Sequence, residues 1–340
     1  MSVNTLLPWQ ESFWKRSFGK RDQLPHALLL TGEAGWGQDH LAQALAARLL
    51  CEREGDEGFA CGVCDACRWL AAGNHPDFRY VTPEEDEAAE GEEKKSGRKQ
   101  IKIDQIRALE DFVFTGSHRQ GKRVIVIDPA EAMNISAANS LLKILEEPPS
   151  TVYFLLISYR WRQLLPTILS RCRRISVERP DAALASAWLE QESGQSRPDA
   201  LMALLGDSPL TAAEWLHDGR WKALPDLVAS FRQTNETPIT LAARWEGLIR
   251  AQAGLNLEAL VGLLAKWLFD LSLCAQAGQV RFFPNEQASL EKLGKDRSAV
   301  RFIHCYNELL KLRRVANHPL NAQLFLEDMA ARYLRAFKAA

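Results

Sequence analysis

The sequence lacks any long apolar segment. Its first 16 residues, MSVNTLLPWQESFWKR, mix polar and charged residues with apolar ones and contain no continuous apolar core like that of a secretion signal. The most apolar later run, residues 259–269, is far shorter than the roughly 20 apolar residues that span a bilayer. We therefore expect a cytoplasmic protein that does not bind membranes.

The sequence also lacks net charge, because 42 lysines and arginines nearly balance 43 aspartates and glutamates and leave a formal charge of −1. A balanced charge does not attract the whole molecule to nucleic acid, so any contact with DNA must use a local basic patch. Hydrophobic residues make up 46% and charged residues 25% of the 340 positions, which is typical of folded globular proteins. A chain of this length is expected to form two or three domains.

The glycine-rich stretch TGEAGWGQDH lacks both residues that carry the chemistry of a phosphate-binding loop. It follows an apolar segment and precedes a helical pattern, and Gly32, Gly35 and Gly37 permit the tight turn of the motif G-x-x-x-x-G-K-[S/T]. Gln38 stands where the motif has a lysine that neutralises phosphates. Asp39 stands where it has a hydroxyl that binds magnesium.

These two substitutions reverse the electrostatics of the loop. Two unit charges about 4 Å apart interact by about 4 kcal/mol at an effective dielectric constant of about 20, so exchanging attraction for repulsion weakens ATP binding by several kcal/mol. We expect a vestigial loop without ATP. Taken alone, the stretch is equally consistent with an unrelated turn in which Asp39 complements the start of a helix.

The apolar segment VIVIDPAEAMN ends in Asp128 and has the form of the strand end that coordinates magnesium in nucleotide hydrolases. It resembles the D-E-A-H version of that motif, in which the second residue is the glutamate that polarises the attacking water. Pro129 occupies this position, and proline has no acid or base group. Glu131 lies two residues farther on, and its position alone does not assign it the role. Asp128 and Pro129 are therefore interpreted as a second vestigial motif.

Short apolar segments alternate with helical patterns over the first 180 residues, which predicts a parallel sheet flanked by helices. The expected strands are residues 27–30, 78–81, 124–127, 153–157 and 174–177. Residues 84–99 contain seven acids, four bases and no large apolar residue, so we expect a solvated loop there. Beyond residue 180 the chain has only helical periodicity.

Four of the seven cysteines are bunched, at Cys51, Cys61, Cys64 and Cys67. Without an export signal, bunched cysteines indicate a metal site rather than disulfides. Four thiolates close a tetrahedral zinc shell with no open position, so the spacing predicts a structural zinc site. An iron–sulfur cluster and free thiols are the alternatives, although Ala71 replaces the last cysteine of the bacterial C-x2-C-x2-C-x3-C-P pattern. The other cysteines, expected to be ordinary core residues, are Cys172, Cys274 and Cys305.

Several motifs of the first 220 residues closely resemble those of the clamp-loader branch of the AAA+ ATPases. They are LLKILEEPP at residues 141–149, SRC at 170–172, LPHALLLTG at 24–32 and GNHPDF at 73–78. The resemblance implies an α/β AAA+ domain of the P-loop NTPase type with a parallel sheet, followed by a small helical lid domain and an all-α collar domain that joins the subunits. The corresponding boundaries are 1–178, with the zinc module at about 51–67, then 179–219 and 220–340. Members of this branch also carry a zinc module at this point.

By this resemblance, Arg171 in the SRC motif is an arginine finger. Such a residue reaches from one subunit to the γ-phosphate of ATP bound by its neighbour and stabilises the charge that develops during hydrolysis. The alternative is an exposed arginine in a basic cluster with Arg173 and Arg174. The sensor position of the family falls near Ser158, where ISYR departs from the usual threonine or asparagine.

The segment IKIDQIRALEDF is expected to form a helix that presents Lys102 and Arg107 to a nucleic-acid backbone. On a helix, one or two cations are also explained by simple solvation.

The resemblance implies a subunit that does not hydrolyse ATP itself but helps to load a sliding clamp onto primed DNA during replication. Its implied partners are the τ/γ ATPase subunits and the δ subunit of a pentameric loader, the β clamp, and DNA reached through the assembled ring. Two alternatives stay open: an active AAA+ ATPase with unconventional nucleotide binding, and a zinc-dependent DNA-binding regulator. The balanced charge and the absence of a C-x2-4-C-x12-H-x3-5-H finger argue against the regulator.

Overall fold

The computed structural model of the chain describes most of the 340 residues. The described residues are 6–18, 24–53, 55–84, 100–114, 121–194, 199–252, 254–295, 297–313, 316 and 321–338. Apart from Glu84, the charged segment predicted to be a solvated loop lies outside them. The chain forms two compact units, an N-terminal unit of residues 1–87 and 99–185 and a C-terminal unit of residues 88–98 and 186–340. The three-domain division with boundaries after residues 178 and 219 stays a prediction.

The N-terminal unit is built on a five-stranded sheet in the order β2-β3-β4-β1-β5, with every pair of neighbours parallel. The strands are β1 (Ala27–Thr31), β2 (Phe78–Val81), β3 (Arg123–Ile127), β4 (Val152–Ser158) and β5 (Arg173–Ser176). Each lies within one residue of its predicted position. The inner strands β1 and β3 are buried along their whole length, as their apolar sequences require, whereas the edge strands β2 and β5 carry exposed residues.

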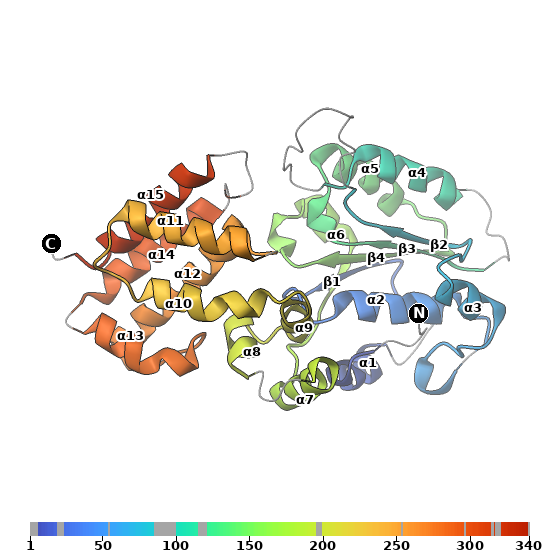
Figure 1. Cartoon of the computed structure of the whole chain (residues 1–340). Helices are drawn as coiled ribbons and strands as arrows, with labels where there is room; N and C mark the ends of the chain where they lie inside the picture. Colours follow the sequence, from blue (N-terminus) through green and yellow to red (C-terminus); the bar gives the residue numbers. More distant parts are fainter. Residues whose placement is uncertain are drawn as a thin grey trace. The chain divides into compact units, whose positions relative to one another are not determined.

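Helices cover both faces of this sheet (Figure 1). On one face, alternate strand residues such as Leu28 and Val126 pack against α1 (Glu11–Ser17) and α2 (Gln38–Leu50). On the other, residues such as Leu29 and Ile125 pack in a second core that includes residues of the helices α4, α5 and α6. The remaining elements are α3 (Asp65–Ala71), α4 (Ile103–Phe114), α5 (Ile135–Glu146), α6 (Pro166–Arg171) and the short turns Pro8–Gln10, Asp56–Gly58, Ala130–Ala132 and Trp161–Gln163.

The parallel arrangement brings the carboxyl ends of all five strands to one edge of the sheet. The glycine loop follows β1, Asp128 follows β3, and Tyr159 follows β4 at this edge. Ligands of open parallel sheets bind at such an edge. The fold therefore places the glycine loop and Asp128 at the same edge of the sheet, with the end of β4 between them.

The C-terminal unit is helical, and α7 (Ala182–Ser193) spans the boundary between the units. Its helices are α8 (Asp199–Leu205), α9 (Pro209–His217), α10 (Leu224–Phe231), α11 (Pro238–Ala251), α12 (Leu257–Ala277), α13 (Gln287–Gly294), α14 (Ala299–Arg313) and α15 (Ala322–Arg335), with short turns at Arg220–Ala223 and Pro284–Glu286. One continuous core runs from Leu204 in α8 to Phe337 after α15. The predicted α/β unit followed by helices is thus confirmed. No helix among the described residues is long and apolar enough to cross a membrane.

Asp270 is a fully buried carboxylate in the long helix α12. Its two oxygens accept the backbone N–H groups of Arg281, Phe282 and Phe283 at 3.0, 2.8 and 2.8 Å. Burial raises the pKa of Asp270, whereas these three hydrogen bonds lower it. The side chain therefore holds the segment after α12 against the middle of the helix.

Asp270→Ala is expected to destabilise the C-terminal unit by about 3 kcal/mol or more, because three backbone donors lose their acceptor in a buried place. Asp270→Asn retains one acceptor oxygen and should lose less. Urea unfolding followed by tryptophan fluorescence measures both values. A loss below about 1 kcal/mol for the alanine variant would contradict the anchoring role.

Candidate functional site

The glycine loop has the backbone that its sequence predicts. It joins the end of β1 to the start of α2, and Gly37 is the residue that caps the helix. Gly35 and Gly37 have φ angles of 84° and 89°, in the left-handed region that favours glycine. The strand, tight turn and helix of a phosphate-binding loop are therefore all present.

Gln38 fills the loop with its own side chain. The side chain is fully buried, and its Nε2 donates a hydrogen bond to the backbone oxygen of Glu33 at 2.8 Å. The same Nε2 lies 2.5 Å from where a Cβ on Gly32 would stand, so the amide occupies the space beside that glycine. In a working phosphate-binding loop, the residue at this position is a cation that contacts phosphate. Here the Gln38 side chain is hydrogen-bonded to the backbone of its own loop.

The N-terminal segment covers the loop from outside. Trp9 Nε1 donates to the backbone oxygen of Trp36 at 3.0 Å, and Gln10 Nε2 donates to the backbone oxygen of Gly37 at 2.6 Å. Leu7 lies so close that its Cδ1 would be 2.4 Å from a Cβ on Gly37. Sequence reasoning missed these contacts, because no local pattern joins residues 27 positions apart.

The Asp128 carboxylate accepts hydrogen bonds from two tyrosine hydroxyls. Tyr80 donates its hydroxyl to Oδ2 at 2.8 Å, and Tyr159 donates to Oδ1 at 3.1 Å. Burial raises the pKa of Asp128; the two hydroxyls lower it, and the negative charges of Asp39 and Glu131 raise it. Burial likewise raises the pKa values of both tyrosines. Both carboxylate oxygens of Asp128 thus accept hydrogen bonds, and the nearby acids Asp39 and Glu131 add negative charge.

Glu131 anchors the chain that follows β4. Its side chain is 3% exposed, and it accepts hydrogen bonds from Ser158 Oγ at 2.6 Å and from the backbone N–H groups of Tyr159 and Arg160 at 3.1 and 3.0 Å. With these three donors, the carboxylate fixes the backbone that follows β4. The predicted sensor position, Ser158, is part of the same anchor.

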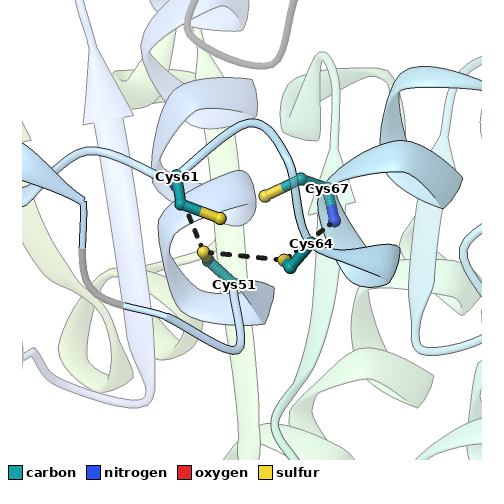
Figure 2. A group of neighbouring side chains, drawn as sticks. All are labelled: Cys51, Cys61, Cys64 and Cys67. Atoms are coloured by element: carbon teal, nitrogen blue, oxygen red, sulfur yellow. Dashed lines mark hydrogen bonds between the residues drawn. The ribbon is translucent and has the colours of Figure 1, made fainter.

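The four bunched cysteines come together at the end of α2 and the start of α3 (Figure 2). Their Sγ atoms all lie within 4.8 Å of one another, and those of Cys51 and Cys64 are 3.9 Å apart. Zinc–sulfur bonds of about 2.3 Å place the sulfurs of a tetrahedral site about 3.8 Å apart, so the cluster fits a metal ion. Cys61 N donates to the Sγ of Cys51 at 3.2 Å, and Cys67 N donates to the Sγ of Cys64 at 3.5 Å.

The cluster combines one accessible thiol with buried ones. Backbone N–H groups of Val63 and Cys64 lower the pKa of Cys61 to about 6. Burial raises the pKa values of Cys51 and Cys67. A metal ion must therefore displace protons from the buried thiols, as a structural site does when it closes.

Arg171 is the last residue of α6, and its side chain is 32% exposed. It donates to the backbone oxygen of Thr167 at 3.0 Å and to Ser170 Oγ at 3.4 Å, and it forms an ion pair with Glu146 at the end of α5. Arg173, two residues farther on, pairs with Leu28 at the start of β1. Arg171 therefore adjoins the amino ends of the strands, whereas the glycine loop lies at their carboxyl ends.

Of the predicted nucleic-acid residues, Lys102 immediately precedes α4 and Arg107 lies within it, and both are exposed. Arg107 pairs with Asp104 of the same helix at 3.6 Å, and both side chains are well solvated. The contact of Lys102 and Arg107 with DNA stays a prediction.

A parallel α/β unit with a strand, glycine turn and helix defines the class of proteins with a nucleotide-binding fold. Within that class, this chain has Gln38 bonded to the backbone of the glycine loop and Asp128 bonded to two tyrosines. The family model described as "DNA polymerase III, delta subunit" matches residues 10–181. The chain belongs to this family, and the curated relatives that it matches are delta′ subunits.

Three relatives illustrate the similarity. The delta′ subunit of DNA polymerase III from Pseudomonas aeruginosa is 45% identical over 210 residues, which cover 61% of this chain and 60% of that protein. Those of Yersinia pestis and Escherichia coli are 34% and 33% identical, covering 66% and 58% of this chain and 66% and 56% of the relatives. The matched regions therefore span less than two thirds of the relatives' own length.

Among solved structures, a DNA polymerase III gamma subunit-related protein of Thermotoga maritima covers 97% of this chain and 100% of its own, with a TM-score of 0.45 and 19% identity.

Proposed function

We propose that this chain acts as the δ′ subunit of a bacterial DNA polymerase III clamp loader. In this role it does not turn over ATP; it helps the τ/γ ATPase subunits and the δ subunit to place the β clamp on primed DNA. The proposal rests on a difference between the residues at the carboxyl ends of the strands and those at their amino ends. The buried Gln38 side chain is hydrogen-bonded to the backbone of the chain's own glycine loop, whereas Arg171 at the other end has a partly exposed side chain.

Arg171 is proposed to complete the ATP site of an adjacent subunit. Its distance along the sheet from the glycine loop favours action on a neighbour over action on its own chain. The ion pair with Glu146 is partly exposed, and such pairs contribute about 1 kcal/mol or less. The γ-phosphate of a bound ATP, with its higher charge, can therefore replace Glu146 as the partner of the guanidinium.

The four cysteines are proposed to hold zinc in a purely structural role. Cys51, Cys61, Cys64 and Cys67 would supply all four ligands, which leaves no position for water or substrate. When bound, the ion supplies a cross-link between the end of α2 and the start of α3 and no reaction chemistry.

Asp128→Asn is expected to leave ATP hydrolysis by the reconstituted loader unchanged within twofold, because two tyrosines already engage this carboxylate. In an active ATPase, losing the magnesium-coordinating carboxylate would abolish turnover. Calorimetric titration of the isolated chain with ATP and magnesium is the companion measurement, and no micromolar binding is expected. Micromolar binding, or lost turnover in the variant, would support the alternative of an unconventional ATPase.

The Asp128→Asn substitution is also expected to change how the free energy of unfolding depends on pH. The pKa of Asp128 is higher in the folded state than in the unfolded state. The carboxyl group therefore stabilises the folded state at pH values below its unfolded-state pKa, and this stabilisation is lost as the pH rises through its folded-state pKa. An uncharged asparagine has no such loss. The free energy of unfolding of Asp128→Asn relative to wild type should therefore be higher at pH 8 than at pH 3.5. A difference that is constant between these pH values would contradict the raised pKa.

Reconstitution tests the proposed function as a whole. Purified ATPase and δ subunits, the β clamp and primed DNA are combined with or without this chain, and loaded clamps are counted. Loading should require the chain, and the chain alone should show no sequence-specific binding to duplex DNA. Loading without it, or sequence-specific binding by the chain alone, would overturn the proposal, the latter in favour of a zinc-dependent regulator.

A further inference from the structure

Helix α1 lies in contact with both unusual features of the N-terminal unit, the four-cysteine cluster and the filled glycine loop. We infer that the metal-bound cluster braces α1, and that α1 in turn holds the N-terminal segment closed over the loop. This inference rests on the metal site of the proposed function but not on the role of Arg171. It gives the cysteine module a role beyond its own stability, namely keeping the N-terminal segment packed against the glycine loop.

The first link joins the cluster to the middle of α1. Phe59 lies between Cys51 and Cys61 in the sequence, and its ring stacks on that of Trp14 with centroids 5.1 Å apart and planes 7° apart. Trp14 is fully buried. An aromatic pair of this geometry contributes about 0.5–1.5 kcal/mol beyond the area that it buries. The loop between the two cysteines thus forms one wall of the Trp14 pocket.

The second link joins the cluster to the end of α1. Arg48 is 5% exposed, three residues before Cys51 at the end of α2, and it donates to the backbone oxygen of Phe18. Its guanidinium atoms also lie 3.1 Å from where a Cβ on Gly58 would stand, so they pack against the backbone of the cysteine loop. This guanidinium therefore contacts both the loop and the residue that ends α1.

The far end of α1 reaches the glycine loop. Gln10, Trp14 and Phe18 are spaced four residues apart, so they follow one face of the helical segment. Gln10 donates to the backbone oxygen of Gly37 at 2.6 Å and to that of Trp36 at 3.2 Å. The seven helical residues span only about 10 Å, and a rigid element of this length transmits a displacement at one end to the other.

The cysteine loop depends on the metal for its shape. Residues 52–60, EREGDEGFA, contain only two apolar side chains, so they cannot form a core of their own. Bonds from the metal to Cys51 and Cys61 fix both ends of this segment and remove most of its freedom. Losing the metal should therefore release Phe59 from Trp14 and loosen Arg48.

Hydrogen–deuterium exchange of the full chain, loaded with zinc or treated with a chelator, tests this coupling. Chelation should speed amide exchange at residues 7–18 and 33–41 by about tenfold or more, as expected when local opening becomes easier by at least about 1.4 kcal/mol. Exchange in β3 should not change. Phe59→Ala should bind zinc normally yet show the fast exchange without chelation. Lys15→Ala, which removes only the exposed ion pair with Glu57, is the matched control and should resemble wild type.

Several results would overturn the inference. One is faster exchange confined to residues 51–71 on chelation; another is a Phe59→Ala variant with a fully protected glycine loop. A chain that binds zinc and shows either result would retain the proposed metal site and lose only the coupling. A chain that binds no zinc would lose both.

Discussion

Arg171→Ala is expected to lower ATP hydrolysis at the adjacent ATPase site by about 10³-fold or more, because an arginine finger in trans contributes about 10³ to 10⁵ to turnover. The measurement uses a reconstituted loader in which every other ATP site has been inactivated, so that only the site served by this chain turns over. The ring should still assemble, because the residue is partly exposed and ends a short surface helix. Clamp loading should fall with hydrolysis.

Two matched variants separate a finger from a merely exposed arginine. Arg173→Ala removes an exposed arginine two residues away and should change hydrolysis by less than about twofold. Glu146→Gln removes the carboxylate that binds Arg171 in the free chain, and hydrolysis should stay the same or rise by at most about fivefold. Equal losses for Arg171→Ala and Arg173→Ala, or full activity of Arg171→Ala, would reject the finger.

Cys67→Ser is expected to abolish stoichiometric zinc binding and to lower the free energy of unfolding of the N-terminal unit by about 3 kcal/mol or more. A ligand present at 100 to 1,000 times its dissociation constant stabilises the folded state by about 3–4 kcal/mol, and structural zinc reaches this range easily. For a unit of this size the loss corresponds to roughly 6–16 °C in Tm. Zinc content is read by a colorimetric assay after denaturation, and Tm by scanning calorimetry.

Cys172→Ala is the matched control for this change, since Cys172 is also buried in the N-terminal unit but lies outside the cluster. It should retain a full complement of zinc. An unchanged Tm for Cys67→Ser, or equal zinc contents in the two variants, would mean that the four cysteines are free thiols. Iron and sulfide in the purified chain would instead support the iron–sulfur alternative.

Much of the fold and several site residues could be predicted from sequence because their signals are local. The strand bounds followed from short apolar runs, and the tight turn, in which Gly35 and Gly37 have positive φ angles, followed from the glycine spacing of a known motif. The four cysteines converge because the first follows the end of one helix and the last two begin the next, all within the 17-residue segment 51–67. Each of these features depends on residues close in sequence.

The contacts of the glycine loop, in contrast, could not be predicted from local sequence patterns. Sequence alone determined that a cation and a hydroxyl were missing, and that charge at Asp39 disfavours phosphate. Only the tertiary structure decided that the space is filled, with Gln38 bonded across the loop, Gln10 bonded to its outside and two tyrosines bonded to Asp128.

The reason is that the contacts of Gln10 and of the two tyrosines join residues 27 to 48 positions apart, in a fold whose strands have a different order in the sheet from their order in the chain. A residue's type limits the chemistry that it can perform, but the packing of distant elements decides which partner it meets. Glu131 is a further example, because only the fold shows that its carboxylate accepts hydrogen bonds from the chain after β4. The sequence by itself determined which parts of an ATPase this protein lacks, and the tertiary structure decided what took their place.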